Sequence, residues 1–300
     1  MNIKQLLVEA RSTLAKSGIE SASLDAELLL AHVIKKNRSY LFAHGDCFLE
    51  LAEYQMFQGL VRRRAAKEPV AYLLGVKEFW SFELSVNPAV LIPRADTECI
   101  VEQVLALPLP GDCVVLELGV GSGAISIAVA HERPDWQVIA NDLSFAALKL
   151  AQYNANKNLS QSSDSSEPVS LFCGNWLQAV SCSSVDLIVS NPPYVAAGDP
   201  LLDEGTQYEP SSALFSEQHG LRDINDIIHH AIYCLRPSGW LVLEHGAQQR
   251  EAILALVAAL DLERLPAPRN DGMCLEFKNI IAVSDLQGQD RGIALQLERS

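Results

Sequence analysis

The sequence has few basic residues for its length. Of its 300 residues, 23 are Lys or Arg and 37 are Asp or Glu, which gives a formal net charge of −14. A surface of this sign repels phosphate backbones, so the composition disfavours nonspecific binding to nucleic acid. We therefore expect no direct nucleic-acid partner.

The sequence also lacks paired cysteines and long apolar runs. Its seven cysteines are scattered and form no Cys-x-x-Cys pair, which argues against a disulfide framework or a zinc cluster. We expect no metal, and a reducing, cytoplasmic location. The first residues lead into an amphipathic pattern instead of a signal peptide, and no run of about 18 uncharged apolar residues occurs, so we expect no membrane partner.

The length suits one ordinary domain with a smaller attachment. Residues 1–75 hold ten basic and eight acidic residues, a balance of +2, which leaves −16 for the rest of the chain. We interpret residues 1–75 as a helical bundle that recognises the substrate, residues 76–93 as a β-hairpin linker and residues 94–300 as the domain that carries the chemistry.

Apolar residues at helical spacing predict the helices of this bundle. One helix is expected over residues 3–16, a second after the N-cap Ser23, and a third roughly over residues 49–64. In the second helix, four residues are expected to face inward, namely Leu24, Leu28, Ala31 and Ile34. The run Arg62-Arg63-Arg64 is interpreted as a solvated helix end.

Beyond the linker, strand-like and helix-like segments alternate. Strands are predicted at residues 114–118, 137–140, 185–190 and 240–244, and helices at residues 123–131 and 144–157. This order predicts an α/β fold, a doubly wound, mostly parallel sheet with helices on both faces.

A glycine-rich turn follows the first of these strands. It comprises Gly119, Val120, Gly121, Ser122 and Gly123. Three glycines allow a tight turn and let a ligand lie against bare backbone at a helix N-terminus. Asp142, which ends the second strand, is placed to bind both hydroxyls of a ribose. The pattern predicts a nucleoside-containing cofactor; S-adenosyl-L-methionine, NAD and a purely structural turn all remain open at this point.

The segment Asn191-Pro192-Pro193-Tyr194 follows a buried strand, at the edge where open α/β sheets bind ligands. An amide or aromatic amine is a poor nucleophile with two N–H donors, and Asn191 Oδ1 and the Pro192 carbonyl can accept one each. Pro193 stiffens the turn, and Tyr194 offers a flat face to a planar group. The motif favours methyl transfer over hydride transfer, although a rigid turn with a core aromatic would also contain these residue types.

Together these motifs resemble the release-factor glutamine methyltransferases, the PrmC or HemK family, over nearly the whole chain. Several further segments carry the resemblance, namely Pro69-x-x-Tyr72-x-x-Gly75, residues 91–98, Tyr208-Glu209-Pro210, Glu244-His245-Gly246 and residues 285–291. Asn-Pro-Pro-Tyr alone is shared with DNA adenine and ribosomal RNA guanine methyltransferases, so these segments decide the family.

The resemblance implies a Rossmann-like, seven-stranded methyltransferase domain with one antiparallel strand near its end. It also implies methylation of the glutamine in the Gly-Gly-Gln loop of peptide chain release factors, with S-adenosyl-L-homocysteine as the product. The glycine turn would approach the methionine part of the cofactor, Asp142 the ribose and Trp176 the adenine, while Asn191 would serve both cofactor and glutamine. We expect a monomer.

The chain departs from the family pattern at a few positions. Ala95 stands where a second proline is usual, Gly292 replaces a β-branched residue, and the stretch 261–276 is longer than usual. Two alternatives remain open: an amino-methyltransferase acting on DNA adenine or ribosomal RNA guanine, and a noncatalytic module that retains cofactor. The first lacks a basic track for its substrate.

Overall fold

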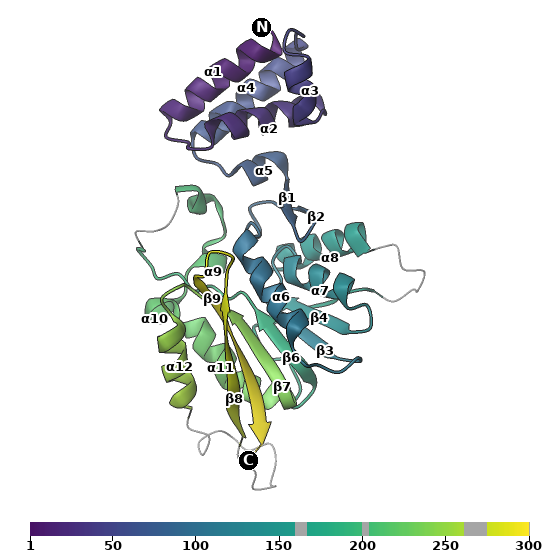
Figure 1. The fold of residues 1–300 in the computed structure, drawn as a ribbon, viewed down its shortest axis with the longest axis vertical. Helices are drawn as coiled ribbons and strands as arrows, with labels where there is room; N and C mark the ends of the chain where they lie inside the picture. Colours follow the sequence, from purple (N-terminus) through teal and green to yellow (C-terminus); the bar gives the residue numbers. More distant parts are fainter. Residues whose placement is uncertain (160–166, 200–203, 261–274, 300) are drawn as a thin grey trace. The chain divides into compact units, whose positions relative to one another are not determined.

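The computed structural model describes residues 1–159, 167–199, 204–260 and 275–299. The chain divides into two compact units, the first comprising Met1–Val76 with Leu202–Tyr208 and the second comprising Lys77–Leu201 with Glu209–Ser300. Figure 1 shows helices in the first unit and a sheet flanked by helices in the second. No helix among the described residues is both long and apolar enough to span a membrane.

The first unit is a helical bundle. Its described residues form α1 (Ile3–Lys16), α2 (Ala22–Ile34), α3 (Arg38–Ala43), α4 (Leu51–Ala65), α5 (Val70–Leu74) and the 3-10 helix η2 (Glu204–Tyr208). Asn2 caps α1 by accepting a hydrogen bond from the Gln5 backbone N–H while the Gln5 side chain accepts one from Asn2. The bundle core contains large apolar side chains, among them Leu6, Leu14, Leu29, Leu30 and Phe57.

Two sequence predictions for this unit are wrong in detail. Helix α2 begins at Ala22 after Ser21, so Ser23 is not its N-cap, and this frame leaves Leu24 43% exposed while Leu29 and Leu30 are buried. Arg64 is not a solvated helix end, because its Nε lies 2.7 Å from Oδ2 of the buried Asp25. The guanidinium neutralises a carboxylate that would otherwise be costly to bury.

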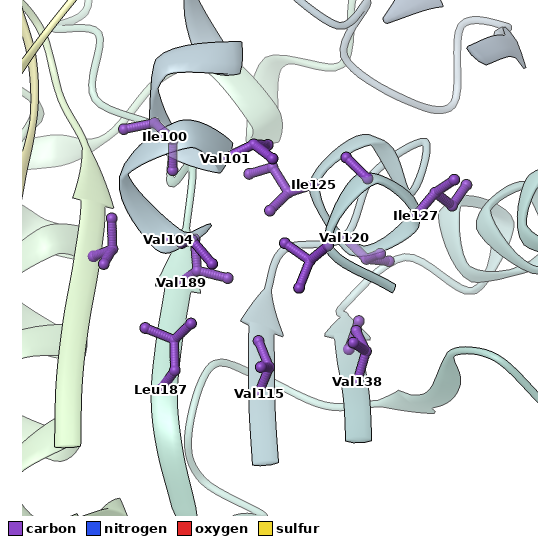
Figure 2. Close-up of a cluster of buried hydrophobic side chains, with 14 of the residues drawn as sticks. Ile100, Val101, Val104, Val115, Val120, Ile125, Ile127, Val138, Leu187 and Val189 are labelled. Carbon is purple, nitrogen blue, oxygen red and sulfur yellow. The ribbon is translucent and has the colours of Figure 1, made fainter. Parts of the chain in front are cut away.

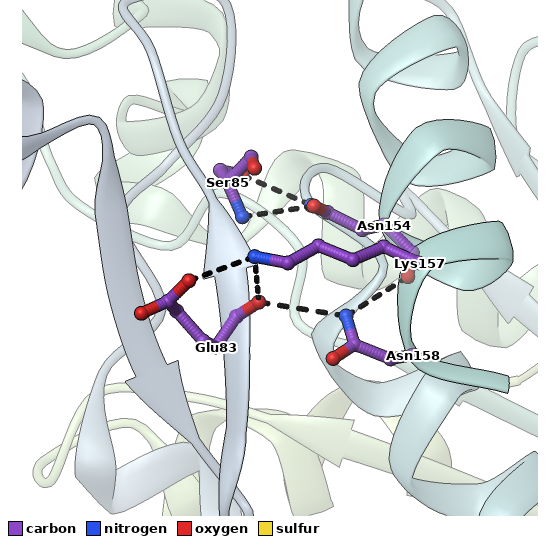
Figure 3. A network of polar contacts seen from close by, with 5 residues as sticks. All are labelled: Glu83, Ser85, Asn154, Lys157 and Asn158. Carbon is purple, nitrogen blue, oxygen red and sulfur yellow. Dashed lines mark hydrogen bonds and ion pairs between the residues drawn. The ribbon is translucent and has the colours of Figure 1, made fainter.

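A β-hairpin opens the second unit. Strands β1 (Val76–Phe79) and β2 (Phe82–Ser85) are joined by Trp80 and Ser81, which both have positive φ, as a tight two-residue hairpin turn requires. Figure 3 shows how β2 is held by helix α8 (Phe145–Leu159). The amide of Asn154 accepts from the Ser85 N–H and donates to the Ser85 carbonyl, and Lys157 forms an ion pair with Glu83 at 2.9 Å.

The described residues of the second unit form a seven-stranded sheet in the order β5-β4-β3-β6-β7-β9-β8. Its strands are β3 (Val114–Leu118), β4 (Gln137–Asp142), β5 (Ser170–Cys173), β6 (Val185–Ser190), β7 (Leu235–Glu244), β8 (Leu275–Ser284) and β9 (Asp290–Arg299). The pairs from β5 to β7 are parallel, whereas β9 is antiparallel to both β7 and β8. The predicted doubly wound α/β fold with one antiparallel strand is therefore confirmed.

Helices cover both faces of this sheet because alternate strand residues point to opposite sides. Helices α6 (Glu98–Ala106), α7 (Ala124–Glu132) and α8 pack on the face that carries Val115 and Leu187. Figure 2 shows this cluster, with Ile100 of α6 among the labelled side chains. Helices α11 (Arg222–Cys234) and α12 (Arg250–Ala258) cover the face that carries Leu116 and Ile188.

One departure from the family pattern has a packing explanation. A Cβ added at Gly292, on β9, would lie 2.5 Å from Ile100 Cδ1 and 2.8 Å from the Leu243 carbonyl oxygen, so this chain has no room for a side chain there. Nothing in the structure explains Ala95, which begins the 3-10 helix η1 (Ala95–Thr97). The longer stretch 261–276 lies outside the described residues except at its last two positions.

Candidate functional site

A cavity of about 470 Å³ lies at the carboxyl ends of β3, β4 and β6 in the second unit. This volume falls within the roughly 300–1,000 Å³ typical of small-molecule sites. The wall contains residues from the glycine turn, from the segments after β4 and β6, and from residues 89–97 and 210–215. The cavity therefore lies at the edge of the sheet where open α/β folds bind ligands.

The glycine turn has a backbone conformation that residues with a side chain rarely adopt. Gly119, Gly121 and Gly123 have φ angles of 74°, 52° and 87°. A Cβ at Gly119 would lie 3.4 Å from the Trp176 ring, so the indole lies directly against this bare backbone. The side chain of Asn154 donates to the Ser122 carbonyl at 2.8 Å and helps to hold the turn.

Asp142 lies beside this turn at the end of β4. Its Oδ2 accepts a hydrogen bond from the Gly121 N–H at 3.0 Å, and its Oδ1 accepts one from the Ser144 N–H at 2.7 Å. Both oxygens retain acceptor capacity for ligand hydroxyls, since a carboxylate offers about four lone-pair sites. Trp176 is fixed across the cavity, where its Nε1 donates to Oδ1 of Asp223 at 3.1 Å.

The Asn191–Tyr194 loop is held from two sides. Asn191 Nδ2 donates to Thr97 Oγ1 at 3.3 Å, and the Tyr194 hydroxyl donates to Glu244 Oε1 at 3.1 Å. Behind the loop, Gly220 has a φ of 83°, and a Cβ there would lie 2.0 Å from the Tyr194 carbonyl oxygen. Only glycine, which has no Cβ, allows this close approach. This contact explains why position 220 needs a glycine, which the sequence alone did not reveal.

Most of the predicted site residues lie together. The cavity is lined by Gly119, Val120, Gly121, Ser122, Asp142, Trp176, Asn191 and Pro193. Gly123, Pro192 and Tyr194 are not among the lining residues. Tyr194 instead packs against the apolar cluster that α11 forms with the sheet. The individual roles of all these residues stay predictions.

The structure adds residues to which sequence reasoning gave no role. Arg94 and Thr97 line the cavity, and Arg94 is the one Lys or Arg among the lining residues of the described chain. Its guanidinium forms an ion pair with the buried Glu209, whose other oxygen accepts from the Ile92 N–H. Residues 91–98 contributed to the family resemblance, and only that resemblance indicated from the sequence that Arg94 and Thr97 are important.

Two buried carboxyl groups lie at or next to the cavity. Burial raises the pKa of Glu117, a lining residue, to about 8, although hydrogen bonds from Ser126 oppose the shift. Burial likewise raises the pKa of Glu244 to about 7, against the opposing effects of the Thr97 hydroxyl and of the hydrogen bond from the Tyr194 hydroxyl. Perturbed carboxyl groups of this kind are concentrated at functional sites.

The fold and the site define a Rossmann-like methyltransferase, because the glycine turn and the Asn-Pro-Pro-Tyr loop meet at the carboxyl edge of a mostly parallel sheet. The chain matches the PrmC N-terminal domain over residues 5–75 and the methyltransferase small domain over residues 98–204.

Known proteins of the same family align with most of the chain. The release factor glutamine methyltransferase of Salmonella typhimurium is 44% identical over 257 residues, which are 85% of this chain and 90% of that protein. The Vibrio cholerae protein of the same name is 39% identical over 97% of this chain and 95% of its own length. The chain therefore belongs to the release factor glutamine methyltransferase family, which confirms the resemblance.

Proposed function

We propose that this chain transfers a methyl group from S-adenosyl-L-methionine to the side-chain amide nitrogen of the glutamine in the Gly-Gly-Gln motif of peptide chain release factors. The observation that carries this proposal is the position of Asn191, which lines one cavity together with the glycine turn and Asp142. The family of the chain supports the choice of substrate.

The residues present fit this cofactor. The bare backbone of Gly121 leaves room for the methionine part, and Asp142 would accept hydrogen bonds from the ribose hydroxyls. The Trp176 indole offers an apolar surface for the adenine. When bound, S-adenosyl-L-methionine supplies an electrophilic methyl group on a sulfonium.

The remaining chemistry concerns the orientation of a weak nucleophile. An amide nitrogen reacts only if its lone pair is directed at the methyl group, and Asn191 Oδ1 with the Pro192 carbonyl would hold its two N–H groups in that direction. The amide can lose its proton after the C–N bond forms, so no general base is needed before attack. Pro193 would stiffen the loop, and the hydrogen bond from the Tyr194 hydroxyl to Glu244 would hold its far end in place.

Labelled S-adenosyl-L-methionine would test this proposal directly. The protein is incubated with a release factor, with the same factor carrying a substitution of its Gly-Gly-Gln glutamine, and with DNA or RNA. We expect label in the intact factor alone. Label in nucleic acid would support an amino-methyltransferase instead, which a balance of −16 beyond residue 75 disfavours. No label anywhere would favour the noncatalytic module.

For the helical first unit we propose a role in substrate recognition. Residues 1–75 have a balance of +2 against −16 for the rest, and they contain none of the cavity-lining residues. A truncated chain that starts at Val76 should still bind S-adenosyl-L-methionine but show a greatly raised KM for the release factor. An unchanged KM would contradict the role, and an unfolded truncation would indicate a stabilising cap. The cytoplasmic location and the monomeric state stay predictions.

A further inference from the structure

A buried carboxyl group lies beside the hydroxyl group that accepts a hydrogen bond from Asn191. Asn191 Nδ2 donates to Thr97 Oγ1 at 3.3 Å, and the Thr97 hydroxyl is close enough to Glu244 to lower the pKa of its carboxyl group. Thr97 and Glu244 are 4% and 2% exposed. Thr97 also lines the cavity, whereas Glu244, at the end of β7, does not.

The chemistry of these groups gives the contacts a direction. An ionised carboxylate only accepts hydrogen bonds, and a hydroxyl has a single proton to donate. If Thr97 donates its proton to Glu244, it can only accept from Asn191. The Asn191 side chain must then present its NH₂ to Thr97, which leaves Oδ1, the acceptor, at the other end of the amide for the cavity.

We propose that Glu244, acting through Thr97, determines which end of the Asn191 amide faces the substrate, so that both are positioning residues. The inference rests on the proposed function, because a glutamine N–H needs an acceptor and not a donor at this point. An Asn191 amide turned the other way would present its N–H groups to the N–H groups of the substrate glutamine, and the nucleophile would no longer be held in place.

Glu244 also holds the second end of the Asn191–Tyr194 loop. Its Oε1 accepts from the Tyr194 hydroxyl at 3.1 Å, so one carboxyl group holds residues on both sides of Pro192 and Pro193. Its Oε2 is buried and has no hydrogen-bond partner among the described residues. A buried oxygen without a full set of partners is costly, and such a cost is typical of functional sites.

The groups around Glu244 keep its protonation finely balanced. Besides Thr97 and Tyr194, Arg291 favours the carboxylate and Asp96 opposes it. Arg291 is itself ion-paired with both Asp96 and Asp285, at 2.9 Å each. Burial raises the pKa of the nearby Cys99 thiol and lowers the pKa of His245, so both shifts favour the neutral form.

This balance predicts a pH dependence. Because burial raises the pKa of Glu244 to about 7, mild acidification converts it to the neutral acid. A neutral acid can donate to Thr97, and the Thr97 proton is then no longer directed away from Asn191. The rate constant kcat should therefore rise with pH through about 7 and be lost below it, although the substrate amide does not titrate in this range.

The test compares kcat and KM for a release factor, at saturating S-adenosyl-L-methionine, between pH 5.5 and 9. Thr97→Val removes the hydroxyl with little change of shape, and Thr97→Ser restores it. We expect Thr97→Val to lower kcat about tenfold or more with an S-adenosyl-L-methionine Kd within about twofold of the parental value. Thr97→Ser should stay within about threefold in kcat, and Glu244→Gln should remove the acid limb near pH 7.

Several results would overturn the inference. These are a parental kcat in Thr97→Val, an acid limb that persists in Glu244→Gln, or equal losses in Thr97→Val and Thr97→Ser. The wild-type pH profile requires no variant, so a misfolded Glu244→Gln chain still leaves the inference open to refutation by a flat profile. If the parental chain fails to label the release factor at all, the proposed function fails instead.

Discussion

The two units bury carboxyl groups in different ways. In the helical unit, Asp25 is buried but lies 2.7 Å from the Arg64 guanidinium, so its charge is neutralised on the spot. In the larger unit, Glu117 and Glu244 are just as buried, but hydroxyl groups are their hydrogen-bond partners and neither forms an ion pair among the described residues. Both lie at or next to the cavity.

This difference shows in which unit the fold buries carboxyl groups without a cationic partner, at a cost in stability. A buried pair with a guanidinium serves the stability of the bundle, since removal of one partner leaves an uncompensated charge. Carboxyl groups without a cation have raised pKa values and cost free energy, and proteins retain them mainly where a ligand or a reaction needs them. The comparison predicts that removing a paired charge from the helical unit lowers its stability. Substitutions of polar residues around the cavity should instead change ligand binding, rate and the dependence of stability on pH.

The largest expected effect is on the stability of the helical unit. Asp25→Ala leaves Arg64 without its partner, and we expect a loss of about 3 kcal/mol in the free energy of unfolding. Glu27→Ala is the matched control on the same helix. Its partner Arg38 has 47% of its side chain exposed, against 16% for Arg64, so the Glu27–Arg38 pair should contribute about 0–1 kcal/mol. Denaturation monitored by circular dichroism would measure both, and equal effects would contradict the comparison.

Asn191→Ala should act on rate and leave stability nearly unchanged. Since its amide orients the nucleophile and its contribution is largest in the transition state, we expect turnover to fall about 10²-fold. Single-turnover transfer of label to a release factor measures this loss. Methylation at the parental rate would exclude Asn191 from the mechanism.

Asp142→Ala should act on cofactor affinity. Loss of charge-assisted hydrogen bonds to ribose hydroxyls should weaken binding of S-adenosyl-L-methionine by roughly 1.5–3 kcal/mol, with the fold intact. Calorimetry gives the Kd directly. Asp135→Ala is a suitable control, because Asp135 is a surface carboxylate paired with Arg133 just before the same strand. Unchanged affinity in Asp142→Ala would mean that the ribose assignment is wrong.

The sequence predicted the architecture because the relevant signals are local. Alternating apolar segments placed β3, β4 and β6 within two residues of their observed ends, and the glycine turn was recognisable since it needs positive φ. Strand β5 was not predicted, because a four-residue edge strand that reads Ser-Leu-Phe-Cys has no distinctive pattern.

The cavity wall was only partly predictable. Asn191 was found from its motif, but Thr97 lies 94 positions away in the chain and meets it only through the tertiary fold. The sequence predicted Glu244 within a buried strand, but its contact with Tyr194 was equally hidden, because the two residues lie 50 positions apart in the chain. The prediction of Ser23 as an N-cap was wrong because α2 begins at Ala22, and even its N-cap residue Ser21 makes no side-chain capping hydrogen bond.

The smallest expected effect concerns Glu117 and the pH dependence of stability. Its pKa of about 8 in the folded protein lies above the ordinary value of a glutamate, so the folded state holds a proton that the unfolded state has lost. Stability should therefore fall as pH rises from about 4.5 to 8. Glu117→Gln, which keeps the shape and cannot ionise, should reduce this fall by about 1.4 kcal/mol for each pH unit between those values. Urea unfolding of the ligand-free protein at pH 5.5 and pH 6.5 measures the difference, with the exposed Glu78→Gln as the control. If Glu117→Gln loses stability with rising pH as steeply as the parental chain, burial of the unpaired Glu117 carboxyl group does not destabilise the larger unit as the comparison requires.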